Sequence, residues 1–300
     1  MGPYWGLDLG GTKIEGVALA DAASADALCR MRLPTEMAGG YYHVLGQVHK
    51  LVEVMAAEVG VRPAAVGIGV PGALDPITKT LKSSGHEALD GKPLQRDLET
   101  YLGIPVRLAN DANCFALAEA RHGAAAEACP GAKCVVGVIV GTGVGAGIVI
   151  NGRVYSGRQG IAGEWGHVPL HDEHEPCSCG RIGCLETVIA GPALERFYAA
   201  RAGRELPLVD IVQRAGNADA DAAATVDRLV YNFARGLGSL INVLDPDCIV
   251  VGGGVSHVDA LYDQGLELVK RFVYNPRLDT QLLRPRLGDS AGVFGAAMLG

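Results

Sequence analysis

The sequence lacks several features that would assign it to a class directly. It has no excess of basic residues, since 26 Lys and Arg stand against 33 Asp and Glu for a formal net charge of −7. This balance argues against nucleic acid or an anionic membrane surface as the main partner, but it is compatible with a small anionic ligand. The first residues have neither the basic nor the apolar region of a secretory signal, and position 6 is glycine where a myristoylation motif needs serine or threonine. We therefore expect a cytoplasmic protein.

Long hydrophobic runs and the common nucleotide motifs are missing as well. Residues 134–152 carry no charge, but six glycines interrupt them and they end in an Asn-Gly turn, which predicts two short buried strands instead of a membrane-spanning helix. No Walker A lysine pattern occurs. Residues 141–146 match the G-x-G-x-x-A fingerprint, but a strand-like segment follows where a dinucleotide-binding fold needs a helix. A Rossmann site is therefore not expected.

Glycine, in contrast, is abundant, with 42 residues among 300, and its placement is informative. Apolar segments at residues 4–9 and 14–19 flank a Gly-Gly-Thr turn, and segments at 135–140 and 146–150 flank a Gly-Thr-Gly turn. A third glycine turn follows a predicted strand at residues 252–254. Backbone N–H groups in such turns can bind phosphate oxygens. Any one turn could be a hairpin without a ligand, but the matched pair, each with a threonine, favours a nucleotide.

The remaining pattern predicts two similar α/β halves. Apolar residues recur with a helical period over residues 41–59, and further helices are expected over 111–121, 218–244, 257–273 and 291–299. At about 150 residues per domain, the chain length suggests two domains.

Two aspartates are candidates for chemistry. Asp8 stands inside the first predicted strand, where a buried charge is costly without a cation, and a water-bridged Mg²⁺ fits that position. Asn110-Asp111 precedes an alanine-rich segment, which is typical of a helix N-cap. The alternative is that Asp111 accepts the proton of an attacking hydroxyl group, and the two roles are compatible because a helix N-terminus keeps a carboxylate ionised.

Three of the eight cysteines are clustered, at Cys177, Cys179 and Cys184, and His167 lies ten residues before the first of them. Together they supply four ligands of the number and type that tetrahedral Zn²⁺ takes. Four protein ligands leave no open position, so such a zinc would be structural. Redox-active cysteines are the alternative, although a disulfide across C-x-C is strained.

These motifs together resemble a known family. Residues 8–13 resemble the first phosphate loop of the sugar-kinase/actin/Hsp70 superfamily, residues 141–145 the second, and residues 252–254 the adenosine loop. Glu164-Trp165-Gly166-His167 and the C-x-C-G-x-x-G-C-x-E pattern at 177–186 resemble the signature of the ROK family of bacterial sugar kinases and repressors. The resemblance runs from residue 4 to residue 299.

The resemblance implies an α/β, two-lobed actin-like fold of the hexokinase type (ribonuclease H-like) with a zinc-bound loop. Residues 1–117 and 288–300 would form a small lobe, and residues 118–287 a large lobe with the zinc motif. It also implies ATP and Mg²⁺ as cofactors and a homodimer without nucleic acid or membrane partners.

The site residues that the resemblance implies fall into three sets. ATP would be bound by Asp8, Gly10, Gly11, Thr12, Lys13, Gly141, Thr142, Gly143, Gly253 and Gly254. The sugar would be bound by Gly72, Asn110, Asp111, Glu164, His167 and Glu186, with Asp111 as the catalytic base, and the structural zinc by His167, Cys177, Cys179 and Cys184. From the residues alone, Glu164 and Glu186 could instead support the zinc ligands.

The identity of the sugar is the least determined part. Residues 109–114, 162–167 and 244–247 are most similar to the fructokinase/mannokinase branch, so we expect transfer of the γ-phosphoryl group of ATP to the 6-hydroxyl of fructose or mannose. The N-acetylglucosamine kinase branch is nearly as similar and is the alternative. Close relatives carry a sugar-binding asparagine that aligns with Gly85, and the space left there could admit a 2-acetamido group.

Two other classes of protein fit the sequence less well. A ROK repressor carries an N-terminal helix-turn-helix domain, whereas the first phosphate loop begins at Asp8, so repression is a distant alternative. A chaperone-type or filament-forming ATPase of the same superfamily is disfavoured by the zinc cluster and by the carboxylates assigned to the sugar.

Overall fold

The computed structural model describes residues 3–21 and 26–299. The chain forms two compact units. One comprises Met1–Gly131, Gly147–Gly163 and Arg286–Gly300, and the other Ala132–Ala146 and Glu164–Pro285. The chain therefore passes from one unit to the other four times. The lobe boundaries expected from the sequence, after residue 117 and before residue 288, stay a prediction.

The first unit is built on a five-stranded sheet with the order β3-β2-β1-β4-β7. β1 (Tyr4–Leu9), β2 (Lys13–Leu19) and β3 (Ala27–Pro34) are antiparallel, and β4 (Val66–Val70) and β7 (Val106–Asn110) run parallel to β1. β4 is buried along its whole length, as expected of a central strand covered on both faces. The predicted N-terminal hairpin is confirmed.

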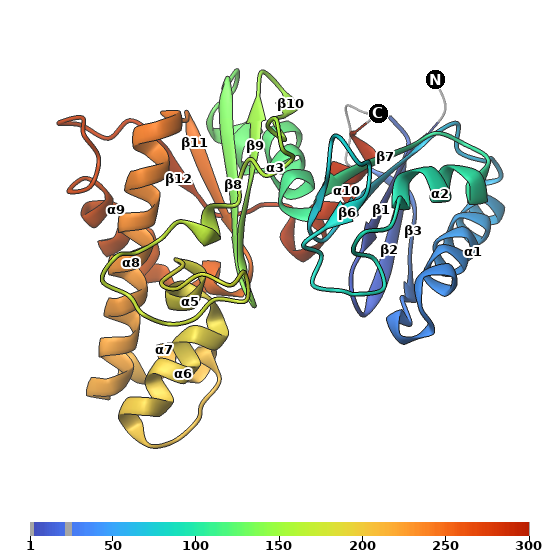
Figure 1. Ribbon diagram of the computed structural model, residues 1–300. Helices are drawn as coiled ribbons and strands as arrows, with labels where there is room; N and C mark the ends of the chain where they lie inside the picture. The colour runs from blue at the N-terminus through green and yellow to red at the C-terminus, as the bar shows by residue number, and fades with distance from the viewer. Residues whose placement is uncertain (1–2, 22–25, 300) are drawn as a thin grey trace. The chain divides into compact units, whose positions relative to one another are not determined.

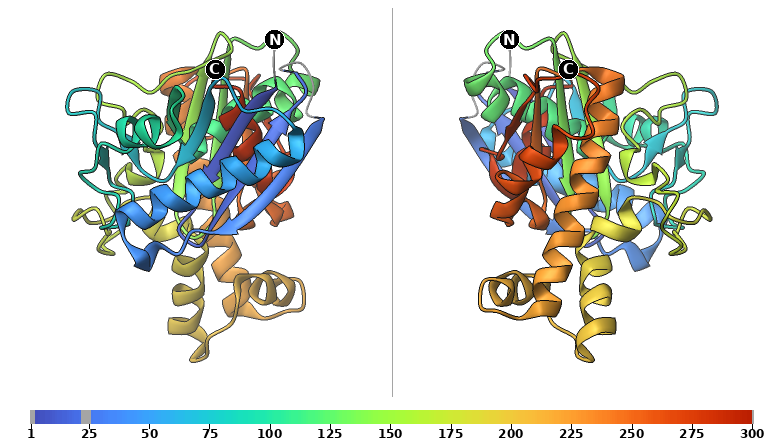
Figure 2. Two further views of the ribbon diagram at one scale, coloured as in Figure 1. Left: turned by 90° about the vertical axis from the view of Figure 1, so that its right-hand side faces the viewer. Right: turned by 90° about the vertical axis from the view of Figure 1, so that its left-hand side faces the viewer.

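Helices cover both faces of this sheet. α1 (Tyr41–Val59) and α2 (Leu94–Leu102) share a hydrophobic core with Trp5, Leu7 and Leu9 of β1. On the opposite face α10 (Ala291–Ala297) packs on β1 and β4, and α3 (Asp111–Arg121) packs beside it. Figure 2 shows α1 crossing in front of the sheet and α10 behind it. The predicted helices at 41–59 and 111–121 are confirmed.

A second five-stranded sheet has the order β10-β9-β8-β11-β12. β8 (Cys134–Val140) and β9 (Val144–Ile150) are neighbours, and β10 (Arg153–Val154) pairs antiparallel with β9. β11 (Cys248–Gly252) is parallel to β8, and β12 (Gln281–Leu283) is parallel to β11. Both sheets thus contain a hairpin whose first strand pairs with a parallel strand, β2-β1-β4 in one and β9-β8-β11 in the other. This repeat confirms the predicted pair of β-glycine-β turns.

The second unit is organised around α8 (Ala220–Leu244), which confirms the helix predicted there (Figure 1). α8 begins at Asp219, whose carboxylate accepts hydrogen bonds from the backbone N–H groups of Asp221 and Ala222. Two helices that sequence analysis did not predict, α6 (Gly191–Ala202) and α7 (Leu208–Ala215), lie beside the first part of α8 (Figure 1). The remaining short elements are β5 (Ala73–Leu74), β6 (Leu81–Lys82), α4 (Ala124–Ala128), α5 (Glu186–Ile189) and α9 (Gln264–Val269).

The helix predicted over residues 257–273 is wrong. Two 3₁₀ turns, Gly254–His257 and Asp259–Leu261, precede a short α9. Val255, Val258 and Leu261 are buried, and their spacing of three residues matches the 3₁₀ repeat. An apolar pattern does not separate the two kinds of helix here, because their periods differ by only about half a residue per turn.

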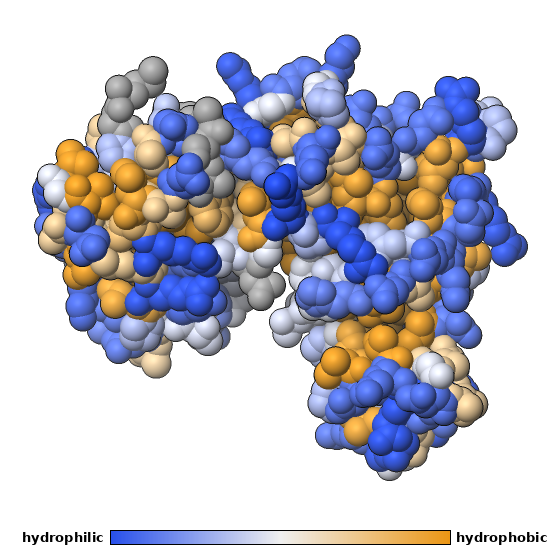
Figure 3. Space-filling model, turned by 180° about the vertical axis from the view of Figure 1, so that it is seen from behind, coloured by the Kyte–Doolittle hydropathy of each residue, from blue (hydrophilic) through white to orange (hydrophobic). Residues whose placement is uncertain are grey.

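On the face shown in Figure 3, hydrophilic side chains are interspersed with hydrophobic ones. Among residues 3–21 and 26–299, no helix combines the length and the apolar character needed to cross a bilayer.

Candidate active site and metal cluster

Residues assigned to the sugar and to Mg²⁺ meet at one edge of the first sheet. Because β1, β4 and β7 are parallel, their carboxyl ends share an edge. Asp8 lies near the end of β1, Gly72 follows β4, and Asn110 and Asp111 lie where β7 passes into α3.

The two aspartates at this edge influence each other. Burial, together with the negative charges of Asp111 and Glu15, raises the pKa of Asp8 to about 6, although Lys13 lowers it. Burial also raises the pKa of Asp111, against hydrogen bonds from the Ala112 N–H group and the Asn110 side chain. Desolvated carboxylates that repel one another favour a divalent cation, because its charge offsets both costs. The residues present therefore fit Mg²⁺.

The N-cap of α3 is Asn110. Its Oδ1 accepts hydrogen bonds from the N–H groups of Ala112 at 2.9 Å and Asn113 at 3.4 Å. Its Nδ2 donates to the carbonyl oxygen of Gly72 at 3.0 Å, which ties the helix to the turn after β4. Asp111 is the first residue of the helix, and its Oδ1 accepts a hydrogen bond from the Ala112 N–H group at 2.8 Å. The cap is thus supplied by the neighbouring residue, and Asp111 is available for another role.

The β1–β2 turn forms the candidate first phosphate loop. The Gly10 N–H group donates to the Lys13 carbonyl oxygen at 3.0 Å and closes the turn. Thr35, which follows β3, holds this turn in place. Its hydroxyl donates to the Gly10 carbonyl oxygen at 2.6 Å, and its N–H group donates to the Thr12 carbonyl oxygen at 3.0 Å. Thr12 and Lys13 are exposed. The loop is therefore held by its backbone while both side chains stay accessible.

The β8–β9 turn, in the second unit, is held in a comparable way. The Gly141 N–H group donates to the Gly143 carbonyl oxygen at 2.9 Å, and Gly191 at the start of α6 donates to the Gly141 carbonyl oxygen at 2.8 Å. Oε2 of Glu186 accepts a hydrogen bond from the Val144 N–H group at 2.8 Å. Thr142 and Gly143 are exposed. Glu186, assigned to the sugar from the sequence, is thus also a support of this turn.

The turn after β11 lies beside the β8–β9 turn, because β8 and β11 are parallel neighbours. Gly253 has a φ of 83°, and a Cβ atom built on it would lie 2.4 Å from the Val140 carbonyl oxygen. A side chain is excluded there, which leaves Gly253 and Gly254 as bare backbone at the same edge of the sheet.

The segment Glu164–His167 is fixed by its tryptophan. Nε1 of the buried Trp165 donates to the Gly236 carbonyl oxygen of α8 at 3.0 Å, and its ring meets Phe233 edge to face with centroids 6.3 Å apart. The flanking Glu164 carboxylate lies 3.9 Å from Nε2 of His167. Trp165 therefore sets the positions of both polar residues beside it.

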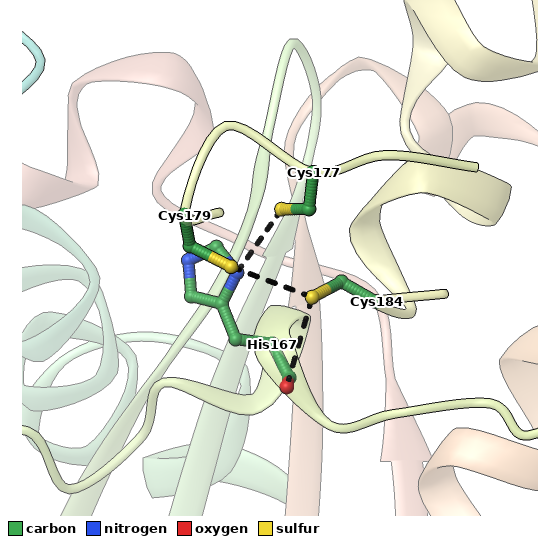
Figure 4. Close-up of side chains that lie close together, drawn as sticks. All are labelled: His167, Cys177, Cys179 and Cys184. Carbon is green, nitrogen blue, oxygen red and sulfur yellow. Dashed lines mark hydrogen bonds between the residues drawn. The ribbon is translucent and has the colours of Figure 1, made fainter. Parts of the chain in front are cut away.

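The clustered cysteines and His167 form a group whose geometry can hold a metal ion. Figure 4 shows the three sulfurs and the imidazole pointing toward one another. Sγ of Cys179 and Cys184 are 3.6 Å apart, Sγ of Cys177 is 3.6 Å from Nδ1 of His167, and the four ligand atoms all lie within 4.8 Å of one another. Tetrahedral zinc with bonds of about 2.3 Å places sulfurs about 3.8 Å apart, so the residues fit that ion.

The ring nitrogens of His167 face different groups. Nδ1 is directed to Cys177, and Nε2 to Glu164. Burial raises the pKa of Cys184 to about 12, while the Arg181 backbone N–H group lowers that of Cys179. A bound zinc ion would reverse the direction at Cys184, because it stabilises the thiolate.

Two arginines of α8 anchor the loop that carries the cysteines, and sequence reasoning missed both. Arg228 makes a bidentate ion pair with Glu173, in which Nη1 lies 2.8 Å from Oε1 and Nη2 lies 2.7 Å from Oε2. Its guanidinium carbon lies 4.7 Å from the centre of the Phe197 ring. Arg235 pairs with Asp172 at 2.6 Å. These partners are 55 and 63 residues apart, so no local pattern signals them.

The predicted site residues divide between the units. Those of the first unit are Asp8, Gly10, Gly11, Thr12, Lys13, Gly72, Asn110 and Asp111, and those of the second are Gly141, Thr142, Gly143, Glu164, His167, Cys177, Cys179, Cys184, Glu186, Gly253 and Gly254. The structure brings the members together within each unit. That all of them act on one sugar and one nucleotide stays a prediction.

Two five-stranded sheets, each with a β-glycine-β hairpin beside a parallel strand, are the arrangement expected of the actin-like, ribonuclease H-like fold to which sugar kinases belong. Solved structures confirm this fold. The crystal structure of a ROK hexokinase from Thermus thermophilus has a TM-score of 0.89 and 35% identity, and the match covers 99% of this chain and 97% of that one. A ROK family glucokinase from Streptomyces griseus, solved with glucose and AMPPNP, has a TM-score of 0.80 and 29% identity over 100% and 99% of the two chains.

The family follows from the sequence match. The ROK family profile matches residues 4–300, so the chain belongs to the ROK family, and within it to the sugar kinases. Among curated relatives, the N-acetyl-D-glucosamine kinase of Pectobacterium atrosepticum is 38% identical over 315 residues, which cover 99% of this chain and 98% of the relative. The expectation of a fructokinase is not confirmed by these relatives, and they favour its alternative.

Proposed function

We propose that this sugar kinase transfers the γ-phosphoryl group of ATP to a hydroxyl group of N-acetyl-D-glucosamine. The observation that carries the choice of sugar is the full-length similarity to curated N-acetyl-D-glucosamine kinases, at 38% identity for the Pectobacterium enzyme. The choice of donor is supported by the AMPPNP complex of the Streptomyces relative.

One feature of the first unit supports an N-acetylated sugar. Gly85 has a φ of 74°, and a Cβ atom built on it would have no heavy atom within 4 Å. The position aligned with the expected sugar-binding asparagine is therefore open. Open space beside the ring suits the extra volume of a 2-acetamido group, whereas fructose would lose a polar partner without replacing it.

Asp111 acts as the general base in this proposal. Its carboxylate accepts the proton of the attacking hydroxyl as the bond to phosphorus forms. Burial raises its pKa, which makes it a better proton acceptor, and the hydrogen bonds of the helix start keep it ionised. Asn110, fixed to Gly72 and to the start of α3, orients the base and the sugar.

The glycine turns bind the phosphates through backbone N–H groups, with Thr12 and Thr142 adding hydroxyl groups. Asp8 would hold Mg²⁺, which would supply positive charge beside the phosphates. Glu164, His167 and Glu186 bind sugar hydroxyls. His167 and the three cysteines would hold a structural zinc ion, which would fix the loop that carries the cysteines and leave no open coordination position for the reaction.

The test is the rate of ADP release with N-acetylglucosamine, fructose, mannose and glucose at fixed Mg·ATP, with Asp111→Asn as the control for contaminating kinases. We expect kcat/KM for N-acetylglucosamine to exceed that for fructose by about tenfold or more. The reverse order would restore the fructokinase prediction. No turnover with any of the sugars above the control would refute the assignment of the sugar-binding residues.

A further inference from the structure

His86 lies on a turn that is rigidly held. The segment follows β6, and the His86 N–H group donates to Oγ of Ser84 at 3.1 Å. Asp90 accepts a hydrogen bond from the Ser84 N–H group at 2.9 Å, and the Leu89 N–H group donates to the His86 carbonyl oxygen at 2.9 Å. The backbone position of His86 is therefore fixed before any ligand binds.

The same segment packs on the turn that Asn110 holds. A Cβ atom built on Gly72 would lie 2.4 Å from the Lys82 carbonyl oxygen and 2.7 Å from the Ser84 nitrogen. Gly72 also accepts the hydrogen bond from Asn110. The turn of His86 is thus attached, through Gly72, to the two residues that we assign to the acceptor sugar and the base.

The side chain of His86 reaches the first phosphate loop. A Cβ atom built on Gly11 would lie 2.7 Å from both Cε1 and Nε2 of the imidazole. The edge of the ring that carries Nε2 therefore rests on the backbone of Gly11. His86 contacts the phosphate loop on one side and is anchored to the acceptor side on the other, and both contacts lie within the first unit.

We propose that His86 is a phosphate-binding residue, whose Nε2–H group donates a hydrogen bond to the γ-phosphoryl group at the point where it leaves the loop for the sugar. This inference rests on the proposed function. During transfer the γ-phosphoryl group moves from the phosphate loop to the acceptor hydroxyl. The His86 imidazole contacts Gly11 of that loop, and its turn packs against Gly72, which Asn110 holds, so the imidazole lies between the two sites. Donors aimed at transferring phosphoryl oxygens stabilise the charge that they carry.

The test compares binding of AMPPNP with binding of ADP, which lacks the γ-phosphoryl group. In His86→Ala, the Kd of AMPPNP measured by titration calorimetry with Mg²⁺ should rise about tenfold or more, the effect of losing a hydrogen bond to a charged group. The Kd of ADP should change less than about twofold, since it makes no such contact. His86→Gln, which keeps an N–H donor at a similar distance, should recover most of the AMPPNP affinity. His49→Ala, on the exposed side of α1, is the matched control.

Three results would overturn the inference. Equal losses for AMPPNP and ADP would make His86 a structural support of the loop. A rise in the KM of the sugar alone, with both nucleotides unaffected, would make it a sugar contact. Unchanged binding of AMPPNP, ADP and the sugar would mean that His86 contributes to the binding of none of them. If His86→Ala does not fold, the pair His86→Leu and His86→Gln makes the same comparison. Failure of the proposed function is distinct, because wild-type protein would then bind AMPPNP without phosphorylating a sugar.

Discussion

Asp111 carries the proton transfer in the proposed mechanism, and its neighbour makes the substitution informative. Because Asn110 caps α3, Asp111→Asn removes the base without removing the cap. General bases contribute ~10²–10⁴-fold, so kcat should fall at least ~100-fold, while sugar and AMPPNP still bind in titration calorimetry. The exposed Asp227→Asn on α8 is the control and should leave kcat unchanged. A kcat above about a tenth of the wild-type value in Asp111→Asn would contradict the role of base.

Asp8 predicts a pH dependence of stability in protein without magnesium or nucleotide. Its folded-state pKa, about 6, lies above the value of 3.8 expected of an unfolded chain, so the folded protein binds this proton more tightly. The contribution of Asp8 to the free energy of unfolding therefore falls as pH rises from about 4 through about 6. Asp8→Asn removes the charge, so it should stabilise the protein at pH 8, and by about 1 kcal/mol more than at pH 5.

Urea unfolding of both proteins at the two pH values measures this difference, and chelators are omitted so that they do not remove a metal ion bound by His167 and the cysteines. If the free energies of unfolding of the wild type and Asp8→Asn differ by the same amount at pH 5 and pH 8, Asp8 does not titrate in this range. The same variant should lose kinase activity if Asp8 holds Mg²⁺.

Among the elements, the loop with the three cysteines depends on two separate supports. Zinc would fix it from within, and the arginines of α8 fix it from outside through Glu173 and Asp172. Glu186 connects it to the β8–β9 turn, since Oε2 accepts from Val144 and Oε1 lies 3.9 Å from Sγ of Cys177. Loss of a bound metal ion should therefore disturb the β8–β9 turn as well as His167 and Glu186, which we assign to the sugar.

Removing one ligand tests this. Purified protein should contain about one zinc ion per chain, and Cys179→Ser should lose it together with thermal stability, because binding of a structural zinc ion contributes directly to folding. Cys129→Ser, outside the cluster, is the matched control and should keep the metal. Active, well-folded wild-type protein without zinc in elemental analysis would rule the site out.

At the scale of the complete chain, the first unit is assembled from three separated segments, and Glu119 joins two of them. This buried carboxylate accepts hydrogen bonds from the N–H groups of Ala124 at 2.7 Å, Arg286 at 3.1 Å and Leu287 at 3.0 Å. It thereby fixes the point at which the chain returns to the first unit ahead of α10.

Glu119→Gln should lower the free energy of unfolding by about 1–3 kcal/mol, because an NH₂ group would face backbone donors that lose their acceptor. Denaturant unfolding measures the change, with the exposed Glu58→Gln of α1 as the control. Equal stability of the two variants would show that the returning segment is held by the packing of α10 alone.

What the sequence fixes is local. The two hairpins follow from apolar runs around glycine turns, and the grouping of His167 with the three cysteines follows from their short spacing, so short-range geometry was enough to predict both. The Asn110-Asp111 pair showed that a helix would begin there, but not which of the two caps it, because that depends on whether each side chain turns back to the helix or away. The helix predicted over residues 257–273 is wrong for a related reason. Buried residues at every third position fit an α-helix and a 3₁₀ helix about equally well.

Folding in three dimensions settled what depends on distant partners. Arg228 with Glu173, Glu119 with Arg286, and His86 with Gly11 join residues that are 55 or more positions apart, and nothing along the chain marks them as neighbours. The raised pKa of Asp8 likewise comes from burial and from the charge of Asp111, 103 positions away. The sequence shows Asp8 as an isolated charge, whereas the structure pairs it with a second carboxylate. Such contacts arise only when distant segments of the chain fold against one another, because charge and burial act through space and not along the sequence.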